Sequence, residues 1–193
     1  MIPVLVPSQY ESMALNHQKI QDAGGAVYSF GMGKVKTMLG CHILARGYSK
    51  HMVLTGFAGT LNSNLKRGDI IEPKVLIEKD FDARPLSSEV HYIERQRGGD
   101  PGSIDCIMHT RDRFITSQDC EMEADAHKDD FLACDMESYA FAYFCSNTSI
   151  PYTIIKVISD GAGLDAEKEF RESCKEYGKM LTDLIVKTVR RIS

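Results

Sequence analysis

The sequence predicts an α/β fold in which helices flank a largely buried central β-sheet. Three observations support this prediction. Short apolar runs typical of buried strands alternate along the chain with segments that have helical spacing of apolar residues. Most of the strand-like runs are apolar throughout, as expected for strands covered on both faces. Finally, 193 residues that are 43% hydrophobic can fill one substantial core, and no repeat or linker divides them, so we expect a single domain over residues 1–193.

The first third of the chain is expected to alternate between strands and helices. Prolines bound the apolar run "IPVLVP", which predicts a buried strand. The next segment has Met13, Leu15 and Ile20 near helical spacing and ends at two glycines, a common helix stop. "GKVKTMLGCHILARG" repeats the helical spacing. The expected elements are a strand at 2–7, a helix at 11–23, a strand at 26–30, a helix at 33–47 and a strand at 51–59.

The rest of the chain continues the alternation. "GDIIEPKVLIEKDFD" has β character, and Pro73 within it suggests an edge strand or a bulge. "IDCIMHTRDRFIT" is expected to be a strand that continues into a loop. An apolar helix, a strand and a long amphipathic helix complete the fold. The ranges are 68–82 and 104–116 for the two β segments, 137–148 for the apolar helix, 152–159 for the last strand and 165–192 for the C-terminal helix.

Composition and charge exclude several functional classes. The net charge is only −4, and the one dense basic cluster lies at the C-terminus, so nothing indicates nucleic-acid binding. The six cysteines show no C-x-x-C spacing, which argues against a metal site. No apolar run reaches the roughly 18 residues of a membrane span, and the apolar N-terminus lacks a basic flank. We therefore expect a cytoplasmic, reduced protein that binds neither nucleic acid nor membrane.

Acidic residues stand at the ends of two apolar segments, "DMESYAFAY" (135–143) and "KVISDGAG" (156–163). A carboxylate there costs free energy unless it is paired, solvated or used. Asp135, Glu137 and Asp160 are therefore candidates for a site. In open α/β sheets, ligands collect at the carboxyl ends of the strands. The segments expected at such ends are 8–11, 31–33, 56–59, 112–114 and 159–160.

Each of these segments also has a simpler structural interpretation. The G-x-G of "FGMGKV" lacks the full dinucleotide fingerprint, and a tight strand-to-helix turn explains it better than a nicotinamide site. Gly56 and Gly59 permit either close approach of a ligand or a positive φ. Asp135 can be read as a helix N-cap with Glu137 in the first turn, and Asp112 as a turn residue.

Six blocks run in a fixed order from residue 31 to residue 160: "GMGKV", "TGFAGTLNSNLKRGDII", "DFDARPL", "RDRFIT", "DMESYAFAYFC" and "PYTIIKVISD". In this order they resemble the nucleoside phosphorylase/nucleosidase superfamily, and they are most similar to its 5′-methylthioadenosine/S-adenosylhomocysteine nucleosidases. The resemblance implies a central mixed β-sheet flanked by helices. It also implies cleavage of the N-glycosidic bond between a purine and ribose, through a transition state with positive charge on the sugar. No metal or organic cofactor is implied.

The resemblance assigns roles to the acidic residues. The leaving purine gains electrons, and Asp160 matches the family acid that protonates its N7. To donate at neutral pH this acid must hold a proton, so burial or a nearby acid must raise its pKa. Ser159 is similar to the family serine that helps to hold the acid. Glu137 matches the glutamate that binds the ribose hydroxyls and favours positive charge on the sugar, and Met136 packs against the sugar.

Further residues complete the implied site. Glu11 lies near the position where the nucleosidases carry the glutamate that activates water, and an acid with a base is the logic of glycoside hydrolysis. Phe114 and Ile115 resemble the pair that stacks on the adenine and binds its edge. The glycine-rich end of the expected strand at 51–59 adds three expected substrate contacts: Phe57, Ala58 and Gly59.

The chain also departs from the family. Leu54 and Phe57 stand where the phosphorylases carry an arginine and a serine for phosphate. A buried dianion without cationic partners is very costly, so water is the expected nucleophile. The segments after Glu11 and between Leu86 and Cys106 are shorter than in the usual nucleosidase. In the family the second segment helps to close the 5′ end of the site across a dimer interface, so the 5′-substituent preference stays open.

The expected function is hydrolysis of 5′-methylthioadenosine and S-adenosylhomocysteine, small purine nucleosides of methionine salvage, with release of adenine by a homodimer. Two alternatives are enzymes: a nucleosidase for another purine nucleoside, such as futalosine, and a nucleoside phosphorylase. A third alternative, from another class, is a catalytically degenerate nucleoside-binding protein. The presence of Glu11, Glu137 and Asp160 together favours the enzyme.

Overall fold

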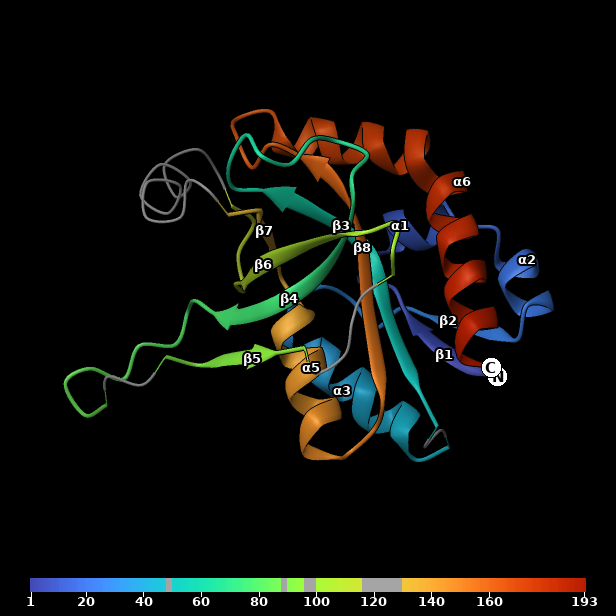
Figure 1. Ribbon diagram of the computed structural model, residues 1–193, viewed down its shortest axis with the longest axis horizontal. Coiled ribbons are helices and arrows are strands. Elements are labelled where there is room, and N and C mark those ends of the chain that lie inside the picture. The colour runs from blue at the N-terminus through green and yellow to red at the C-terminus, as the bar shows by residue number, and fades with distance from the viewer. Residues whose placement is uncertain (48–49, 88–89, 96–99, 116–129) are drawn as a thin grey trace.

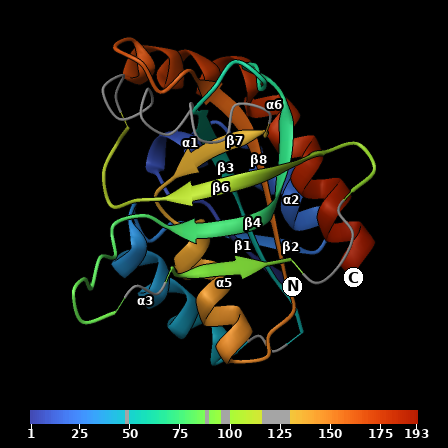
Figure 2. The same cartoon turned by 60° about the vertical axis from the view of Figure 1, so that its left-hand side comes forward.

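The computed structural model of the chain describes residues 1–47, 50–87, 90–95, 100–115 and 130–193. Within these ranges, eight strands form one mixed sheet with helices on both sides (Figures 1 and 2). The strands are β1 Ile2–Leu5, β2 Gly25–Tyr28, β3 Met52–Thr60, β4 Ile70–Glu78, β5 Tyr92–Glu94, β6 Ile104–Thr110, β7 Leu132–Asp135 and β8 Tyr152–Asp160. The helices are α1 Gln9–Met13, α2 His17–Asp22, α3 Lys34–Ala45, α5 Ser138–Asn147 and α6 Ala166–Ile192.

Five of the strands pair in a closed ring. β3 pairs in parallel with β8 and, toward its carboxyl end, antiparallel with β7. β8 pairs with β4, β4 with β6, and β6 with β7, which closes the ring. β1 and β2 extend the sheet from β3 as parallel strands. The predicted mixed sheet flanked by helices is therefore confirmed, while the ring was not predicted, because periodicity indicates strands and not their partners.

Helices cover the sheet on two sides, and each side has its own core. In Figure 1, α6 lies on one side of the sheet, and α3 and α5 lie on the other. Val53 and Phe57 of β3 pack into the core under α6. Leu54 and Ala58, the alternate residues, pack into the core with α3 and α5. All nine residues of β3 are buried, which explains why its sequence is apolar throughout.

The helix expected over 11–23 is two short helices, so this prediction was wrong about continuity. The break is set by packing against α6. Ala14 lies so close to Gly178 that a Cβ on the glycine would be 2.5 Å from the Ala14 carbonyl oxygen. The Asn16 N–H donates to Thr182 Oγ1 at 3.1 Å, and the Asn16 side chain caps α2. A tertiary contact therefore overrides the helical spacing.

Helix α3 forms where predicted, but its apolar stripe faces outward. Val35 is 79% exposed, Leu39 55% and Ile43 48%. Helical spacing alone indicates that a helix forms and does not reveal which apolar residues face the core. The stripe therefore needs another explanation. The buried side of α3 consists of Thr37, Gly40, Cys41 and Leu44.

Pro73 lies at an irregularity of β4, as one of the two sequence interpretations predicted. The register with β6 shifts between Pro73 and Val75. β4 also pairs with β5 and β8, so it is not an edge strand. β5 and β7, which are three and four residues long, were not predicted. Thr116, the last residue of the segment expected at 104–116, lies outside the described residues.

Two expectations from composition can be compared with the described residues. None of the helices in these ranges combines the length and apolar content needed to cross a bilayer. The five described cysteines are free and buried, which fits the expected small apolar role. Cys120, the sixth, lies outside the described residues.

Candidate active site

A cavity lies where β3, β7 and β8 meet the loops that follow β1, β2 and β6. Asp112 does not line it. The Asp112 Oδ1 accepts instead from the Lys34 N–H at 2.8 Å, so this side chain binds the start of α3. All ten predicted site residues line the cavity: Glu11, Phe57, Ala58, Gly59, Phe114, Ile115, Met136, Glu137, Ser159 and Asp160. The others are Pro7, Met32, Arg113, Cys134, Asp135, Ala162 and Phe170.

Glu11 begins a helix and faces the cavity at the same time. Ser8 is the N-cap of α1, and it forms a capping box with Glu11: Ser8 Oγ accepts from the Glu11 N–H at 3.2 Å, and the Ser8 N–H donates to Glu11 Oε2 at 2.8 Å. The Ser8 Oγ also donates to Glu11 Oε2 at 2.6 Å. The Phe57 N–H donates to Glu11 Oε1 at 2.8 Å. An ionised carboxylate has about four acceptor positions. Three are filled here, which leaves room for one further donor such as water.

Two glycines of β3 make space for the carboxylates. Gly56 has φ +139°, and a Cβ there would lie 2.4 Å from Glu11 Oε1. A Cβ on Gly59 would lie 2.8 Å from Asp160 Oδ1 and 3.1 Å from Cys134 Sγ. The sequence left open whether these glycines serve a ligand or a positive φ. Both allow close approach of the protein's own acids, and Gly56 also has the positive φ.

Asp160 is the last residue of β8, and a bulge directs it into the cavity. The register of β8 against β3 shifts next to Gly59 and leaves Ser159 as the extra residue. Asp160 Oδ1 accepts from the Ala162 N–H at 2.9 Å, and Oδ2 lies 2.6 Å from Ser159 Oγ. Burial raises the pKa of Asp160, although the hydrogen bonds from Ser159 and Ala162 act in the opposite direction. The environment therefore favours the protonated acid relative to an exposed aspartate.

The hydroxyl of Ser159 has two acceptors. Its Oγ lies 2.6 Å from Asp160 Oδ2 and 3.2 Å from the carbonyl oxygen of Ala58. When Asp160 is ionised, Ser159 can donate to it. When Asp160 carries a proton on Oδ2, the acid can donate to Ser159, whose own proton then points at Ala58. Both protonation states of Asp160 can thus be satisfied without moving a heavy atom.

A buried lysine that the sequence analysis did not select lies beside the cavity. Lys156, in the middle of β8, is fully buried. Its Nζ lies 2.6 Å from Asp135 Oδ2, 3.5 Å from Glu137 Oε2 and 3.4 Å from the Phe57 carbonyl oxygen. The signal in the sequence was a single lysine within the apolar run "YTIIKVIS". Such a charge needs a partner, and here the partners are the acids at the start of α5.

Charge compensation links Lys156 to three carboxylates. Burial alone would lower the pKa of Lys156, but Asp135, Glu137 and Glu11 raise it above its ordinary value, so the ammonium form persists. Burial raises the pKa of Glu137 to about 7, against the effect of Lys156. The Glu137 Oε1 also accepts from the Gly33 N–H at 3.0 Å. Glu137 is thus held from two sides.

The Asp135 side chain accepts a hydrogen bond from the first residue of α5, whereas the Glu137 side chain accepts none from this helix. The Asp135 carboxylate accepts from the Ser138 N–H at 3.0 Å and from Thr110 Oγ1 at 2.8 Å. Glu137 occupies the N-cap position but makes no capping hydrogen bond with its side chain. The interpretation that placed Glu137 in the first turn as a favourable helix charge was therefore wrong. Its side chain turns toward Gly33 and Lys156 instead.

Aromatic residues form part of the cavity wall. Phe114 is 47% exposed, whereas Ile115 is buried. Phe57 packs edge to face against Phe170 of α6, with 6.1 Å between the ring centroids. The sequence analysis missed Phe170, because it is one apolar residue among many in a long amphipathic helix.

Comparisons with known proteins agree with this architecture. Residues 24–190 match the family model of the phosphorylase superfamily. The 5′-methylthioadenosine/S-adenosylhomocysteine nucleosidase of Oceanobacillus iheyensis is 26% identical over 188 residues, with 84% of this chain and 79% of the relative covered. That of Hydrogenovibrio crunogenus is 28% identical over 166 residues, covering 74% and 70%.

Solved structures share the fold. The 5′-methylthioadenosine/S-adenosylhomocysteine nucleosidase of S. pneumoniae, with the transition-state inhibitor MT-ImmA, has a TM-score of 0.80 at 19% identity, covering 100% of this chain and 99% of that one. The futalosine hydrolase of Helicobacter pylori has a TM-score of 0.78 at 19% identity, covering 97% and 96%. The likeness of backbone is therefore similar for two nucleosidases with different substrates.

Proposed function

We propose, from the premise that this chain belongs to the phosphorylase superfamily, that residues 1–193 form one domain of a purine nucleosidase. The enzyme hydrolyses the N-glycosidic bond of 5′-methylthioadenosine and S-adenosylhomocysteine and releases adenine, as a homodimer in the cytoplasm. The relatives it resembles over most of its length are nucleosidases for these two nucleosides. The geometry of the acids supports the same reaction.

The observation that carries the proposal is the placement of two differently held carboxylates on one cavity. Asp160 packs against Gly59 of β3, and Glu11 packs against Gly56. The two carboxyl groups are therefore held at different positions along β3, and both face the cavity. Hydrolysis of a glycoside needs an acid at the leaving group and a base at the attacking water, so two separately held carboxyl groups suit this reaction.

In the proposed reaction, Asp160 donates its proton to N7 of the purine while the bond between N9 and C1′ breaks. The bonding electrons pass into the purine, and positive charge grows on the ribose. A water adds through its oxygen to C1′, and Glu11 accepts the proton that this water loses. Glu137 binds the ribose hydroxyls and favours the positive sugar, while Met136 packs against it. Proton exchange with solvent then restores Asp160 and Glu11.

Water is the proposed nucleophile because the cavity offers a poor site for phosphate. The Leu54 side chain is buried in the core, and Phe57 packs against Phe170. Lys156 is fully buried and already contacts Asp135 at 2.6 Å. With three carboxylates around this one ammonium, the local charge is negative even when Glu137 is protonated. A phosphate dianion would meet repulsion there.

Base recognition is assigned to the loop after β6. Phe114 offers a half-exposed ring that can stack on the purine, and Ile115 supplies apolar area beside it. Arg113, next in the chain, lines the same cavity but is exposed, so it is not a buried phosphate ligand. The shared fold of a futalosine hydrolase favours futalosine as a second candidate substrate.

The exposed stripe of α3 supports the proposed homodimer. Val35, Leu39 and Ile43 lie on one face of this helix, and Tyr143 of the neighbouring α5 is 48% exposed. Contiguous apolar patches on soluble proteins commonly mark interfaces. A second copy related by a two-fold axis would cover the stripe with the same residues. Analytical ultracentrifugation of wild type and Leu39→Lys tests this, because the substitution should shift dimer toward monomer.

The test of the proposed function is a panel of nucleosides incubated with and without phosphate. The panel holds 5′-methylthioadenosine, S-adenosylhomocysteine, futalosine, adenosine and inosine, and chromatography follows the free base. We expect adenine release from the first two at the same rate in phosphate-free buffer. Formation of a ribose 1-phosphate would overturn the hydrolase assignment. Binding of a nucleoside without release of any base would overturn the assignment as an enzyme.

A further inference from the structure

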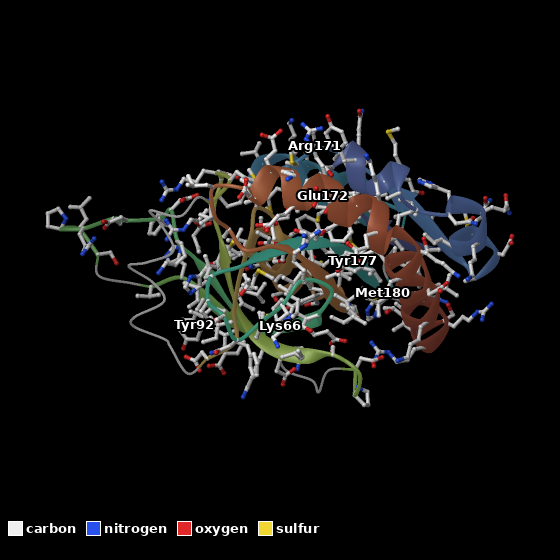
Figure 3. The ribbon with its side chains drawn as sticks, turned by 90° about the horizontal axis from the view of Figure 1, so that it is seen from above. Lys66, Tyr92, Arg171, Glu172, Tyr177 and Met180 are labelled. Carbon is white, nitrogen blue, oxygen red and sulfur yellow. The ribbon has the colours of Figure 1, made fainter. Side chains whose placement is uncertain are left out.

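The turn Lys66–Asp69, between β3 and β4, is fastened to the end of β8. The Gly68 N–H donates to the Ile158 carbonyl at 2.9 Å, and the Ile158 N–H donates to the Asp69 carbonyl at 2.9 Å. Gly68 has φ +91°, and a Cβ there would lie 3.3 Å from the ring of Tyr177 on α6. Figure 3 labels Lys66 on this turn and Tyr177 on the helix. The turn is thus fixed against both β8 and α6.

Arg67 extends from this turn to a buried hydroxyl on α6. Its Nε and Nη2 lie 3.3 and 3.1 Å from Ser173 Oγ. Ser173 is fully buried, and its Oγ lies 2.7 Å from the carbonyl oxygen of Ser159. A guanidinium can only donate, so Ser173 accepts from Arg67 and its single proton goes to Ser159. The direction of each hydrogen bond in the chain is therefore determined.

The bulge explains why Ser159 needs this support. As the extra residue of the bulge, Ser159 has no partner residue on β3. Ser173 donates a hydrogen bond to the carbonyl oxygen of this bulged residue at 2.7 Å. On the other side, the Ser159 hydroxyl lies between Asp160 and the Ala58 carbonyl. A shift of the Ser159 backbone would therefore move this hydroxyl away from the acid.

We propose that Arg67 and Ser173 are positioning residues for Asp160. They hold the bulge at Ser159 so that its hydroxyl stays within reach of both acceptors, and they thereby determine how Asp160 keeps and releases its proton. Neither residue lines the cavity, so both act through Ser159. The inference rests on the proposed function, in which Asp160 is the general acid.

Charges near Asp160 determine in which direction its pKa should change when Arg67 is replaced. The positive charge of Arg67 lowers the pKa of Asp160, whereas Glu169 raises it, and burial remains the largest influence. Glu169 also accepts from the Gly161 N–H at 2.9 Å, so it holds the loop after the acid. Arg67 is paired in turn with two acids of α6, Glu172 at 3.8 Å and Glu176 at 3.7 Å. Other titratable groups on the same cavity are Glu11, Arg113, Cys134, Asp135 and Glu137.

The experiment compares Arg67→Met, Arg67→Lys and Ser173→Ala with wild type. We expect Arg67→Met to lower kcat about ten- to a hundredfold with little change in KM, because the acid and not the binding surface is displaced. The alkaline limb of its kcat profile should move to higher pH, since the charge that lowers the pKa of Asp160 is lost. Arg67→Lys keeps the charge, so its limb should stay near that of wild type. Ser173→Ala should lower kcat while Arg67 is still present.

A matched control is Lys175→Met, which removes a positive charge from the exposed face of α6, the helix that carries Ser173. This substitution should change neither kcat nor the alkaline limb of the kcat profile. Wild-type kcat and pH profile in Arg67→Met and Ser173→Ala would overturn the proposal. A lower melting temperature of Arg67→Met with an unmoved alkaline limb of its kcat profile would also overturn it. An NMR titration of the Asp160 carboxyl carbon, assigned by its absence in Asp160→Asn, reads the same shift without turnover. Failure of the proposed function appears separately, as wild-type protein that releases no base.

Discussion

Glu11 of α1 and Asp160 of β8 face the same cavity and are held in nearly the same way, yet one detail differs. Glu11 and Asp160 each accept from a serine and a backbone N–H, and each packs against a glycine of β3. The Ser8 hydroxyl is held in a capping box with Glu11. The Ser159 hydroxyl has a second acceptor within reach, the Ala58 carbonyl. Ser8 therefore suits a carboxylate that only accepts hydrogen bonds, as Glu11 does. Ser159 suits a carboxyl group that can also donate, as Asp160 does when it is protonated.

This difference shows how two carboxyl groups on one cavity can take opposite roles. A base must keep an acceptor position open, whereas an acid must hold a proton that its neighbours tolerate. Glu11 has three donors and lies near the positive charge of Lys156. Burial raises the pKa of Asp160, and the largest opposing influence is a hydroxyl that can turn away. The assignment of acid and base thus follows from the surroundings and not from the side chains.

The largest expected effect comes from removing the acid. Asp160→Asn keeps the size of the side chain but cannot supply the proton, so kcat should fall by roughly 10²–10⁴-fold. Steady-state release of adenine measures the loss, and thermal unfolding should show that the fold remains. Turnover close to that of wild type would refute the assignment of Asp160 and erase the contrast with Glu11.

Removing Lys156 tests how the buried carboxylates Asp135 and Glu137 are compensated. Lys156→Met should destabilise the fold by roughly 3–5 kcal/mol, because it leaves Asp135 and Glu137 buried without their counter-charge. Urea denaturation measures this effect. The double variant Lys156→Met, Asp135→Asn should recover part of the loss, since one uncompensated charge disappears. If the single variant is as stable as wild type, Lys156 does not offset the free-energy cost of burying Asp135 and Glu137.

Lys156 also marks the limit of what could be predicted from the sequence. The site residues were found because short blocks with glycines and acids have recognisable order, and all ten of the predicted residues line the cavity. Lys156 lies within one of these blocks, but it reads as part of a buried strand. Its role depends on where Asp135 and Glu137 lie in the fold, and strand pairing determines their positions. A charge in an apolar strand was the available signal.

The fold shows the same division between local and tertiary information. Long segments such as α6 and β8 were predicted nearly to their ends, because α6 has a strong helical periodicity and β8 is a continuous, mostly apolar run. The break between α1 and α2 was missed because close packing against Gly178 decides it. The exposed stripe of α3 was also unforeseen, since spacing does not say which neighbour a face will meet.

Glu11→Gln should lower kcat about a hundredfold, near the lower end of the range for general catalysis, because a cation-like sugar needs less help from a base than the purine needs from an acid. KM should change little, as expected for an interaction made mainly in the transition state. Glutamine keeps an acceptor for the Phe57 N–H, so the melting temperature reports how much of the loss is structural. An equal fall in kcat at every pH together with a large rise in KM would argue for a binding role instead.

The last prediction concerns the pH dependence of stability at Glu137. Burial raises the pKa of Glu137 to about 7, from an ordinary value of 4.5. Its contribution to stability is therefore complete below pH 4.5 and is lost as the pH rises through about 7, at up to roughly 1.4 kcal/mol per pH unit. Glutamine cannot ionise, and Asp135 still compensates Lys156, so Glu137→Gln should escape this loss. Denaturation of both proteins at pH 5, 6, 7 and 8 should show the variant gaining on wild type up to about pH 7 and keeping a constant difference above it. If the stabilities of the two proteins change in parallel with pH, the pKa of Glu137 is the same in the fold as in water. Among these carboxyl groups, a pKa raised by burial would then be left for Asp160 alone.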